Sequence, residues 1–166
     1  MKLIVAVDKN WGIGKKNDLL FSLPLDMKFF REKTANKVVI MGYNTLLSFP
    51  QSKPLKNRTN VVLAPETVGR DDCIVVHSLD ELKTVLAQYD TNDVFVIGGA
   101  MFYRTMYPYC DEAYITRVDA DGGAEVFFDN LDNLDNWTRT NISKPLETNG
   151  YTIQFTCYKN SRPLKF

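Results

Sequence analysis

The stretch "DVFVIGGAMFY", residues 93–103, joins two different sequence patterns through a pair of glycines. Residues 93–98 form a short apolar run rich in β-branched side chains, which is typical of a strand buried on both faces of a sheet. The helical pattern that follows extends over residues 99–109. A strand, two glycines and a helix in this order predict one unit of an α/β fold, with Gly98 and Gly99 at the carboxyl end of the strand.

The same kind of unit recurs on both sides of this stretch. Pro24 favours the first turn of a helix, and Ser78 with Glu81 three residues later forms the pattern of a capping box. We expect strands at residues 3–7, 38–41, 60–64, 73–77 and 112–118, and helices at 24–33, 43–49 and 78–89. This alternation predicts a single α/β domain over residues 1–166, with a mostly parallel central sheet of about eight strands and helices on both faces.

Two segments depart from the repeating unit. The segments 136–143 and 151–159 alternate polar and apolar residues more openly, with "ETNG" (147–150) between them, which predicts a carboxyl-terminal antiparallel hairpin at the sheet edge. Residues 9–23 form a long connection in which Gly12 and Gly14 allow bending. A connection of this length is either an ordinary surface loop or a functional one, and we favour the functional reading.

Composition narrows the function classes. The chain has 166 residues, of which 45% are apolar and 24% charged, and its 20 Lys plus Arg balance 20 Asp plus Glu. A chain without net charge lacks the basic field that a nucleic acid or a membrane surface would attract, so neither is expected as a partner. The three cysteines are far apart and predict neither a disulfide framework nor a metal site. The first apolar run is too short for a signal peptide or a membrane span, so we expect a cytoplasmic enzyme or binding protein.

Asp26 lies in an expected helix between two apolar residues, one turn before Phe30. A carboxylate in the first helical turn is stabilised by the helix dipole, by about 0.3–1 kcal/mol, which is one explanation for its position. Burial of an unpaired carboxylate costs far more than this. If Asp26 faces a cleft beside Phe30, it suits a ligand with two adjacent N–H donors, such as a 2-amino heterocycle.

Two strand–glycine–helix junctions are candidate phosphate sites. "VIGGAMFY" (96–103) and "IMGYNT" (40–45) each place glycine before a helix, where backbone N–H groups attract phosphate and a ligand can approach the chain closely. Both patterns are equally consistent with tight structural turns, and the spacing GxGxxG is absent. Arg58 is either a solvated surface side chain or a clamp for a ligand carboxylate. His77 has no catalytic serine or cysteine pattern around it, so nucleophilic hydrolysis is poorly supported.

Several motifs occur in register from residue 3 to about residue 128. They are "IVAVDKNWGIGKKNDL" (4–19), LPxDxxxF from Leu23 to Phe30, "VIMG" (39–42) followed by Thr45, "PLKNR" (54–58), "VIGGAMFY" (96–103) and "YITRVDA" (114–120). Together they resemble the dihydrofolate reductase family, and the closing hairpin is compatible with it. The resemblance implies a cytoplasmic monomer of one-carbon metabolism that reduces 7,8-dihydrofolate to 5,6,7,8-tetrahydrofolate with NADPH, is bound by antifolate inhibitors and needs no metal.

The resemblance also implies roles for residues around the substrate. In the family, the carboxylate at the position of Asp26 binds the 2-amino group and N3–H of the pterin and favours protonation of N5, through water. Thr116 is implied as its hydrogen-bond partner, Phe21 as a further residue of the catalytic site, and Arg58 as the clamp for the glutamate α-carboxylate. The other substrate-binding residues implied are Val5, Ala6, Met27, Phe30, Phe49 and Ile97.

The cofactor is implied to lie along the two glycine junctions, beside residues 9–23 as a mobile lid. The Gly98–Gly99 peptide is expected to be cis. The residues implied around the nicotinamide are Ala6, Ile13, Gly14 and Leu19, and those along the rest of the cofactor are Gly42, Tyr43, Asn44, Thr45, Leu63, His77, Gly98, Gly99, Ala100, Met101, Phe102 and Tyr103.

The chain departs from the family pattern in two places. Leu20-Phe21 stands where the family usually has Pro-Trp, and phenylalanine lacks the indole N–H that helps to hold a water. Tyr43 follows the glycine of "IMG" where Arg or Lys is usual, and Ala64–Pro65 and Met101 also lack a positive charge. With His77 as the remaining basic candidate, we expect NADPH to be preferred over NADH by an unusually small margin.

Two other functions compete with this reading. One is a related reductase acting on another pterin-like or pyrimidine substrate, against which Asp26 and Arg58 argue because they match the two ends of folate. The other is a nucleotide-binding module that has lost turnover, which only Leu20-Phe21 favours.

Overall fold

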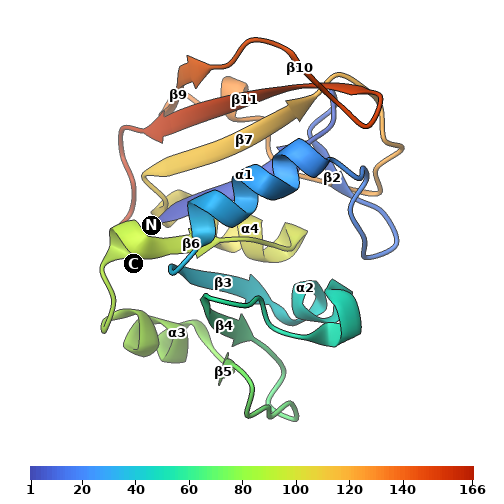
Figure 1. The fold of residues 1–166 in the computed structure, drawn as a ribbon. Coiled ribbons are helices and arrows are strands. Elements are labelled where there is room, and N and C mark those ends of the chain that lie inside the picture. The colour runs from blue at the N-terminus through green and yellow to red at the C-terminus, as the bar shows by residue number, and fades with distance from the viewer.

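A mixed sheet of nine strands forms the centre of the molecule (Figure 1). The computed structural model describes residues 1–166. Along the main path the strand order is β10-β11-β7-β1-β6-β3-β4-β5, and β9 pairs with β11. Neighbours from β7 to β5 run parallel, whereas β11 is antiparallel to β7, β9 and β10. The prediction of a mostly parallel α/β sheet is confirmed.

The parallel strands form where the short apolar runs predict them. They are β1 (Lys2–Val7), β3 (Val38–Gly42), β4 (Thr59–Leu63), β5 (Ile74–Val76), β6 (Val94–Val96) and β7 (Glu112–Val118). The first four residues of β3 are all buried, as expected for a strand that is covered on both faces. Because the carboxyl ends of these strands point the same way, the residues that follow them meet at one edge of the sheet.

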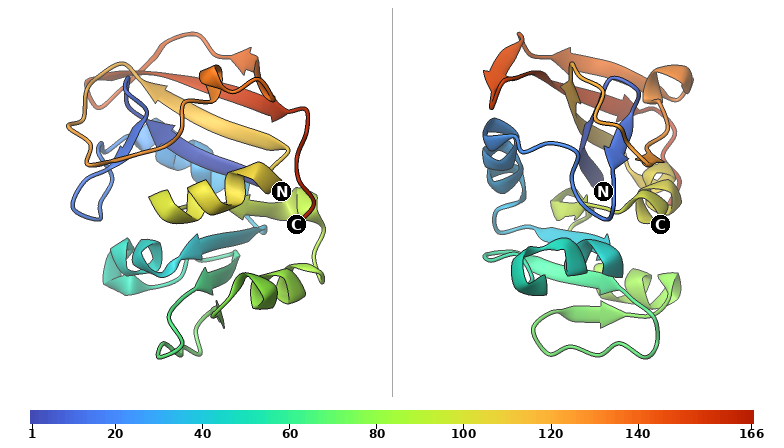
Figure 2. Two further views of the ribbon diagram at one scale, coloured as in Figure 1. Left: turned by 180° about the vertical axis from the view of Figure 1, so that it is seen from behind. Right: turned by 90° about the vertical axis from the view of Figure 1, so that its right-hand side faces the viewer.

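Helices cover both faces of the sheet (Figure 2). Phe29 of α1 and Leu46 of α2 pack into one apolar cluster, whereas Leu82 of α3 and Phe102 of α4 pack into a larger one on the other face. The α-helices are α1 (Pro24–Thr34), α2 (Tyr43–Ser48), α3 (Leu79–Leu86) and α4 (Ala100–Met106), and the 3-10 helices are Pro50–Ser52, Thr91–Asp93, Tyr107–Tyr109 and Leu131–Asn133. None of the helices has the length and apolar character needed to cross a membrane.

The carboxyl-terminal region has one more strand than the sequence analysis predicts. β9 (Trp137–Ile142) and β11 (Tyr151–Asn160) form at the expected places, but the expected connection between them contains β10 (Leu146–Thr148). β10 and β11 make a tight hairpin through Asn149 and Gly150, whose φ angles are +50° and +80°. An Asn-Gly pair is the usual solution for a two-residue hairpin turn, because both positions need positive φ. The signal was therefore present in "ETNG", but the turn is shorter than predicted.

The long connection after β1 is more ordered than a plain loop. β2 (Gly12–Gly14) pairs with β8 (Val126–Phe127) in a separate two-stranded sheet. At its base the buried carboxylate of Asp8 accepts hydrogen bonds from the backbone N–H groups of Asn10 and Gly12 at 2.8 Å and of Gly122 at 3.0 Å. These contacts tie residues 9–23 to the segment after β7.

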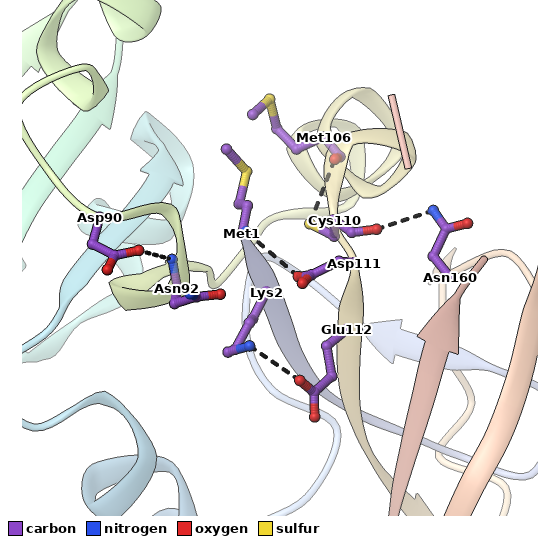
Figure 3. A network of polar contacts seen from close by, with 9 residues as sticks. All are labelled: Met1, Lys2, Asp90, Asn92, Met106, Cys110, Asp111, Glu112 and Asn160. Carbon is purple, nitrogen blue, oxygen red and sulfur yellow. Dashed lines mark hydrogen bonds and ion pairs between the residues drawn. The ribbon is translucent and has the colours of Figure 1, made fainter. Parts of the chain in front are cut away.

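Polar contacts close the other end of the sheet (Figure 3). The amino group of Met1 lies 3.5 Å from Asp111, and Lys2 Nζ lies 3.0 Å from Glu112 Oε2. Both ion pairs join the start of β1 to the start of β7. They lie at the amino ends of these strands, opposite to the edge where the candidate site forms.

Candidate active site

A cleft of about 1130 Å³ opens along the carboxyl ends of β1, β3 and β6. Its walls are built by α1, α2, the start of α4 and the connection that contains β2. Open parallel sheets commonly bind ligands at this edge. Because pockets for single small molecules are typically about 300–1,000 Å³, the cleft has room for more than one ligand.

Asp26 lies in the first turn of α1 and lines this cleft. The hydroxyl of Thr116 on β7 donates a hydrogen bond to its Oδ1 at 2.6 Å. None of the ion pairs of the protein includes Asp26. Burial raises the pKa of the Asp26 carboxyl, and the Thr116 hydrogen bond offsets part of the rise. The carboxylate is therefore desolvated and without a cation, and it suits a ligand that offers N–H donors.

The junction between β6 and α4 exposes bare backbone to the cleft. The Gly98–Gly99 peptide is cis, as expected, and the Gly98 carbonyl accepts a hydrogen bond from the Gly42 N–H at 2.8 Å. A Cβ added to Gly99 would have only the Thr45 hydroxyl within 4 Å, at 3.3 Å. The glycine pair thus leaves space in which a ligand can approach the chain closely. Below it, the buried Tyr103 hydroxyl donates to a β1 carbonyl at 2.7 Å, and burial raises the pKa of Tyr103.

Arg58 lines the cleft and has no acidic partner. Its Nε donates to the Lys56 carbonyl at 2.9 Å and its Nη1 to the Thr34 hydroxyl at 3.1 Å. The guanidinium carbon lies 5.9 Å from the centre of the Phe30 ring. Partial burial and the nearby charge of Arg31 lower the pKa of Arg58. A guanidinium held in place by neutral groups is ready to receive a ligand carboxylate.

The connection between β2 and α1 covers the cleft through Leu20 and Phe21. The Phe21 ring packs edge-on against Tyr151 of the β10–β11 hairpin, with 4.8 Å between ring centres. Gly122 lies directly beneath, since a Cβ there would come within 2.9 Å of both Leu20 and Phe21. Asn149 in the hairpin turn donates to the Ser22 carbonyl at 2.9 Å. Apolar packing and one hydrogen bond therefore hold this connection in place, and Phe21 offers no indole N–H donor.

The structure brings nearly all of the predicted site residues to this one cleft. Those that line it are Val5, Ala6, Ile13, Gly14, Leu19, Phe21, Asp26, Met27, Phe30, Gly42, Tyr43, Asn44, Thr45, Phe49, Arg58, Leu63, Ile97, Gly98, Gly99, Ala100, Met101, Phe102 and Tyr103. Thr116 does not line it and acts through its bond to Asp26. His77 also lies outside the cleft. Its ring Nδ1 is 3.1 Å from the Ala64 carbonyl oxygen, and its backbone N–H donates a hydrogen bond to the Glu81 carboxylate at 2.7 Å.

Sequence reasoning missed other residues that line the cleft. Arg31 follows Met27 by one helical turn on α1, and this spacing could have identified it. Glu125 and Val126 reach the cleft only through the pairing of β8 with β2, for which the sequence holds no local signal.

The lysines and arginines that line the cleft are Lys15, Lys16, Arg31 and Arg58, and none of them belongs to α2, β4 or α4.

A half-buried carboxylate and a bare glycine backbone that face one cleft are typical of an α/β enzyme able to hold a heterocycle beside a second, larger ligand. A sequence model of the family described as dihydrofolate reductase matches residues 1–160. The chain is 32% identical to a dihydrofolate reductase of Bacillus subtilis (strain 168), with 99% of this chain and 97% of that one covered. It is also 32% identical to a dihydrofolate reductase of Haemophilus influenzae, with 92% and 94% covered.

A solved structure is similar over the same span. It is the dihydrofolate reductase from Enterococcus faecalis complexed with NADP(H) and RAB-propyl, with a TM-score of 0.84, 29% identity, and 96% of this chain and 95% of that chain covered. The chain therefore belongs to the dihydrofolate reductase family. Its reaction is the reduction of 7,8-dihydrofolate to 5,6,7,8-tetrahydrofolate with NADPH.

Proposed function

We propose that Asp26 holds the pterin ring of dihydrofolate in the cleft. The observation that carries this is its environment: the carboxylate is desolvated, is bonded by Thr116 and lacks a cation. The 2-amino group and N3–H of a pterin match the two oxygens of a carboxylate. Around this contact, Val5 and Ala6 of β1 and the Ile97 carbonyl region would border the ring.

The protein contributes alignment and protonation to the reaction. NADPH, when bound, supplies the hydride that reduces C6 of the pterin. Asp26 fixes the orientation of the pterin, and its negative charge favours protonation of N5 through water. Leu20 and Phe21 line the cleft, and their apolar side chains would limit the access of water to a bound pterin, which would strengthen the electrostatic effect of the carboxylate. Since Phe21 has no N–H donor, the proton reaches N5 without help from that side chain.

Arg58 would bind the glutamate end of the substrate. Both Arg58, which lies beside Phe30, and Asp26 line the cleft, so one ligand could contact both. Met27, Phe30 and Phe49 line the path between them and would flank the pterin and aminobenzoyl rings. This pairing of a carboxylate with a guanidinium matches the two ends of dihydrofolate.

The other half of the cleft fits NADPH. The open backbone at Gly98 and Gly99 accommodates close approach by a phosphate-bearing ligand, and Thr45 lies against it. Ala6, Ile13, Gly14 and Leu19 would border the nicotinamide, next to the pterin. The rest of the cofactor would contact Tyr43, Asn44, Thr45, Leu63 and residues 100–103. Because no lysine or arginine of α2, β4 or α4 lines this half, the 2′-phosphate relies on neutral donors of these elements, and His77 is not included in the proposal.

The proposal also covers the oligomeric state, the number of domains and the binding of inhibitors. The chain would act as a monomer, as the resemblance to the family implies. Residues 1–166 would fold as one domain, since one nine-stranded sheet includes both β1 and β11. Antifolate inhibitors that carry a 2-amino heterocycle bind at Asp26 in place of the pterin.

The test compares Asp26→Asn with a matched variant. Asn keeps the side-chain shape and loses the charge, so kcat should fall by about 10²-fold or more near neutral pH and recover in part at low pH, where solvent protonates the substrate. NADPH affinity should change little. Asp80→Asn is the control, because Asp80 is an exposed carboxylate in the first turn of α3, outside the cleft. Turnover of Asp26→Asn equal to that of the control would rule out the role.

A further inference from the structure

A second hollow, of about 310 Å³, lies beyond the carboxyl end of β7. Neighbouring residues of a strand point to opposite faces of a sheet. Thr116 meets Asp26 on the α1 face, so Arg117 and the next-but-one residue, Asp119, point to the other face. The hollow is on that other face, and it shares no lining residue with the cleft. It is therefore a separate site and not an extension of the active site.

Positive charge dominates this hollow, which we call the basic groove after Lys9, Arg117 and Arg139. Asp119 is the one carboxylate that lines it, and Arg117 also forms an ion pair with Asp132 at 3.3 Å, so three positive charges against two negative give a formal balance of +1. Neither Lys9 nor Arg139 forms an ion pair. These two side chains line the hollow without a carboxylate partner and are free to bind an anion.

The positions of the two arginines are set by the sheet. Arg117 on β7 lies opposite Gln154 of β11, and Arg139 on β9 lies opposite Tyr158, so both flank β11 on the same face. Strands are about 4.8 Å apart and rise about 3.3 Å per residue, so two strand spacings and the four-residue offset from Gln154 to Tyr158 separate the two arginine Cα atoms by roughly 16 Å. Both side chains are long enough to line one hollow from its two sides. Between them, the Gln154 amide is held in place by donating to the Ser143 carbonyl at 3.0 Å.

Contacts within the protein fix the orientation of the Arg117 guanidinium in the absence of a ligand. Its guanidinium carbon lies 5.0 Å from the centre of the Trp11 ring. Its Nη1 is 3.3 Å from Asp132 Oδ2 and 3.4 Å from the Tyr158 hydroxyl, while the rest of its guanidinium has no protein acceptor. Stacking and these contacts fix the plane of the fork, which lowers the entropy that binding would cost.

We propose that the basic groove binds a compact dianion of the phosphate monoester class. The tetrahedral phosphate group presents several oxygens, which can meet the Arg117 fork, the Arg139 guanidinium and the Lys9 ammonium from different sides. The hollow is too small for an extended polyanion, and the chain as a whole has no net charge to attract one. Lys9 belongs to the segment that leads into β2, so a bound phosphate would also link this segment to β9 and β11.

The test is a titration with inorganic phosphate, followed by backbone-amide NMR. The protein is first saturated with NADPH to fill the phosphate contacts of the cleft, and chloride keeps the ionic strength constant at about pH 8, where phosphate is mainly dianionic. We expect saturable shifts at Lys9, Arg117, Arg139 and Gln154. Shifts that grow without saturation, or that spread evenly over the surface, would overturn the proposal.

Variants and a second anion make the result specific. Arg139→Gln should weaken phosphate binding at least tenfold, because charge-assisted contacts are the strong ones. Arg162→Gln is the matched control, since Arg162 is also exposed, has the same charge and lies outside the groove. Equal affinity in the two variants would contradict the groove as the site. Malonate, whose charge is split over two planar carboxylates, should bind more weakly than phosphate, and equal affinity would contradict the phosphate class.

Discussion

Replacing Thr116 by valine isolates the one side-chain hydrogen bond that Asp26 makes within the protein. The substitution keeps the branched shape of a buried strand residue and removes the hydroxyl that donates to Asp26 Oδ1 at 2.6 Å. The hydrogen bond favours the ionised carboxylate and so opposes the effect of burial on its pKa. In Thr116→Val the pKa of Asp26 should therefore rise further, and dihydrofolate should find fewer ionised carboxylates at a given acidic pH.

The size of the effect follows from the contact. A hydrogen bond to a charged group contributes about 1.5–3 kcal/mol, and 1.4 kcal/mol is a factor of ten in an equilibrium. On the acidic side, where the carboxyl is mostly protonated, dihydrofolate should bind Thr116→Val about 10–100-fold more weakly than the wild type. At higher pH both proteins carry an ionised Asp26, so the ratio of their dissociation constants should shrink.

The assay is equilibrium binding of dihydrofolate without NADPH, measured by tryptophan fluorescence from about pH 5 to pH 9. Thr156→Val is the control, because Thr156 is a buried threonine of the neighbouring strand β11 that donates to the Ile115 carbonyl at 2.6 Å and does not contact Asp26. A constant ratio across the pH range, or the same pH dependence in Thr156→Val, would refute the role of Thr116.

Three further predictions follow from the same site. Arg58→Leu should weaken binding of dihydrofolate and leave pteridines without a glutamate almost unaffected, as titrations of the two ligands would measure; equal losses would make Arg58 structural. Asp26→Asn should raise the Tm at pH 7, because burial raises the pKa of Asp26 in the folded state above its unfolded value, and ionisation of the buried carboxyl then destabilises the fold. The gain in Tm should disappear as the pH falls toward 4, and a gain that is independent of pH would contradict burial as its cause. Tyr43→Arg should increase the preference for NADPH over NADH by about tenfold or more, since no lysine or arginine of α2, β4 or α4 lines the cleft; dissociation constants that leave the preference unchanged would show that the 2′-phosphate lies elsewhere.

The fold was largely predictable because its decisive signals are local. The run "VVIM" is buried in β3, and the Ser78 side chain caps α3 by accepting from the Glu81 N–H, as the capping pattern predicts. The Asn-Gly signal for the tight turn at Asn149 and Gly150 is present in the sequence, but the short β10 beside it has too few residues to show the alternation of polar and apolar side chains. The pairing of β2 with β8 joins residues more than a hundred positions apart, and no local pattern records it.

The site was predictable only in part for the same reason. Asp26 could be recognised as unusual from its apolar neighbours, but its bond to Thr116 spans 90 positions and was accessible only through the family resemblance. Arg31 was within reach of helical spacing. The placement of His77 outside the cleft depends on the carbonyl of Ala64 on the neighbouring chain segment, which no spacing rule foretells.

The central claim is that this cleft brings NADPH and dihydrofolate together for reduction of the pterin. Its most direct test is the loss of nicotinamide absorbance when the wild-type protein is mixed with both compounds, with each one omitted in turn. We predict loss of one NADPH for each dihydrofolate consumed, and none when dihydrofolate is omitted or replaced by a pyrimidine of riboflavin synthesis. Intact binding of both ligands without any loss of absorbance would contradict the account and would identify a binding module without turnover.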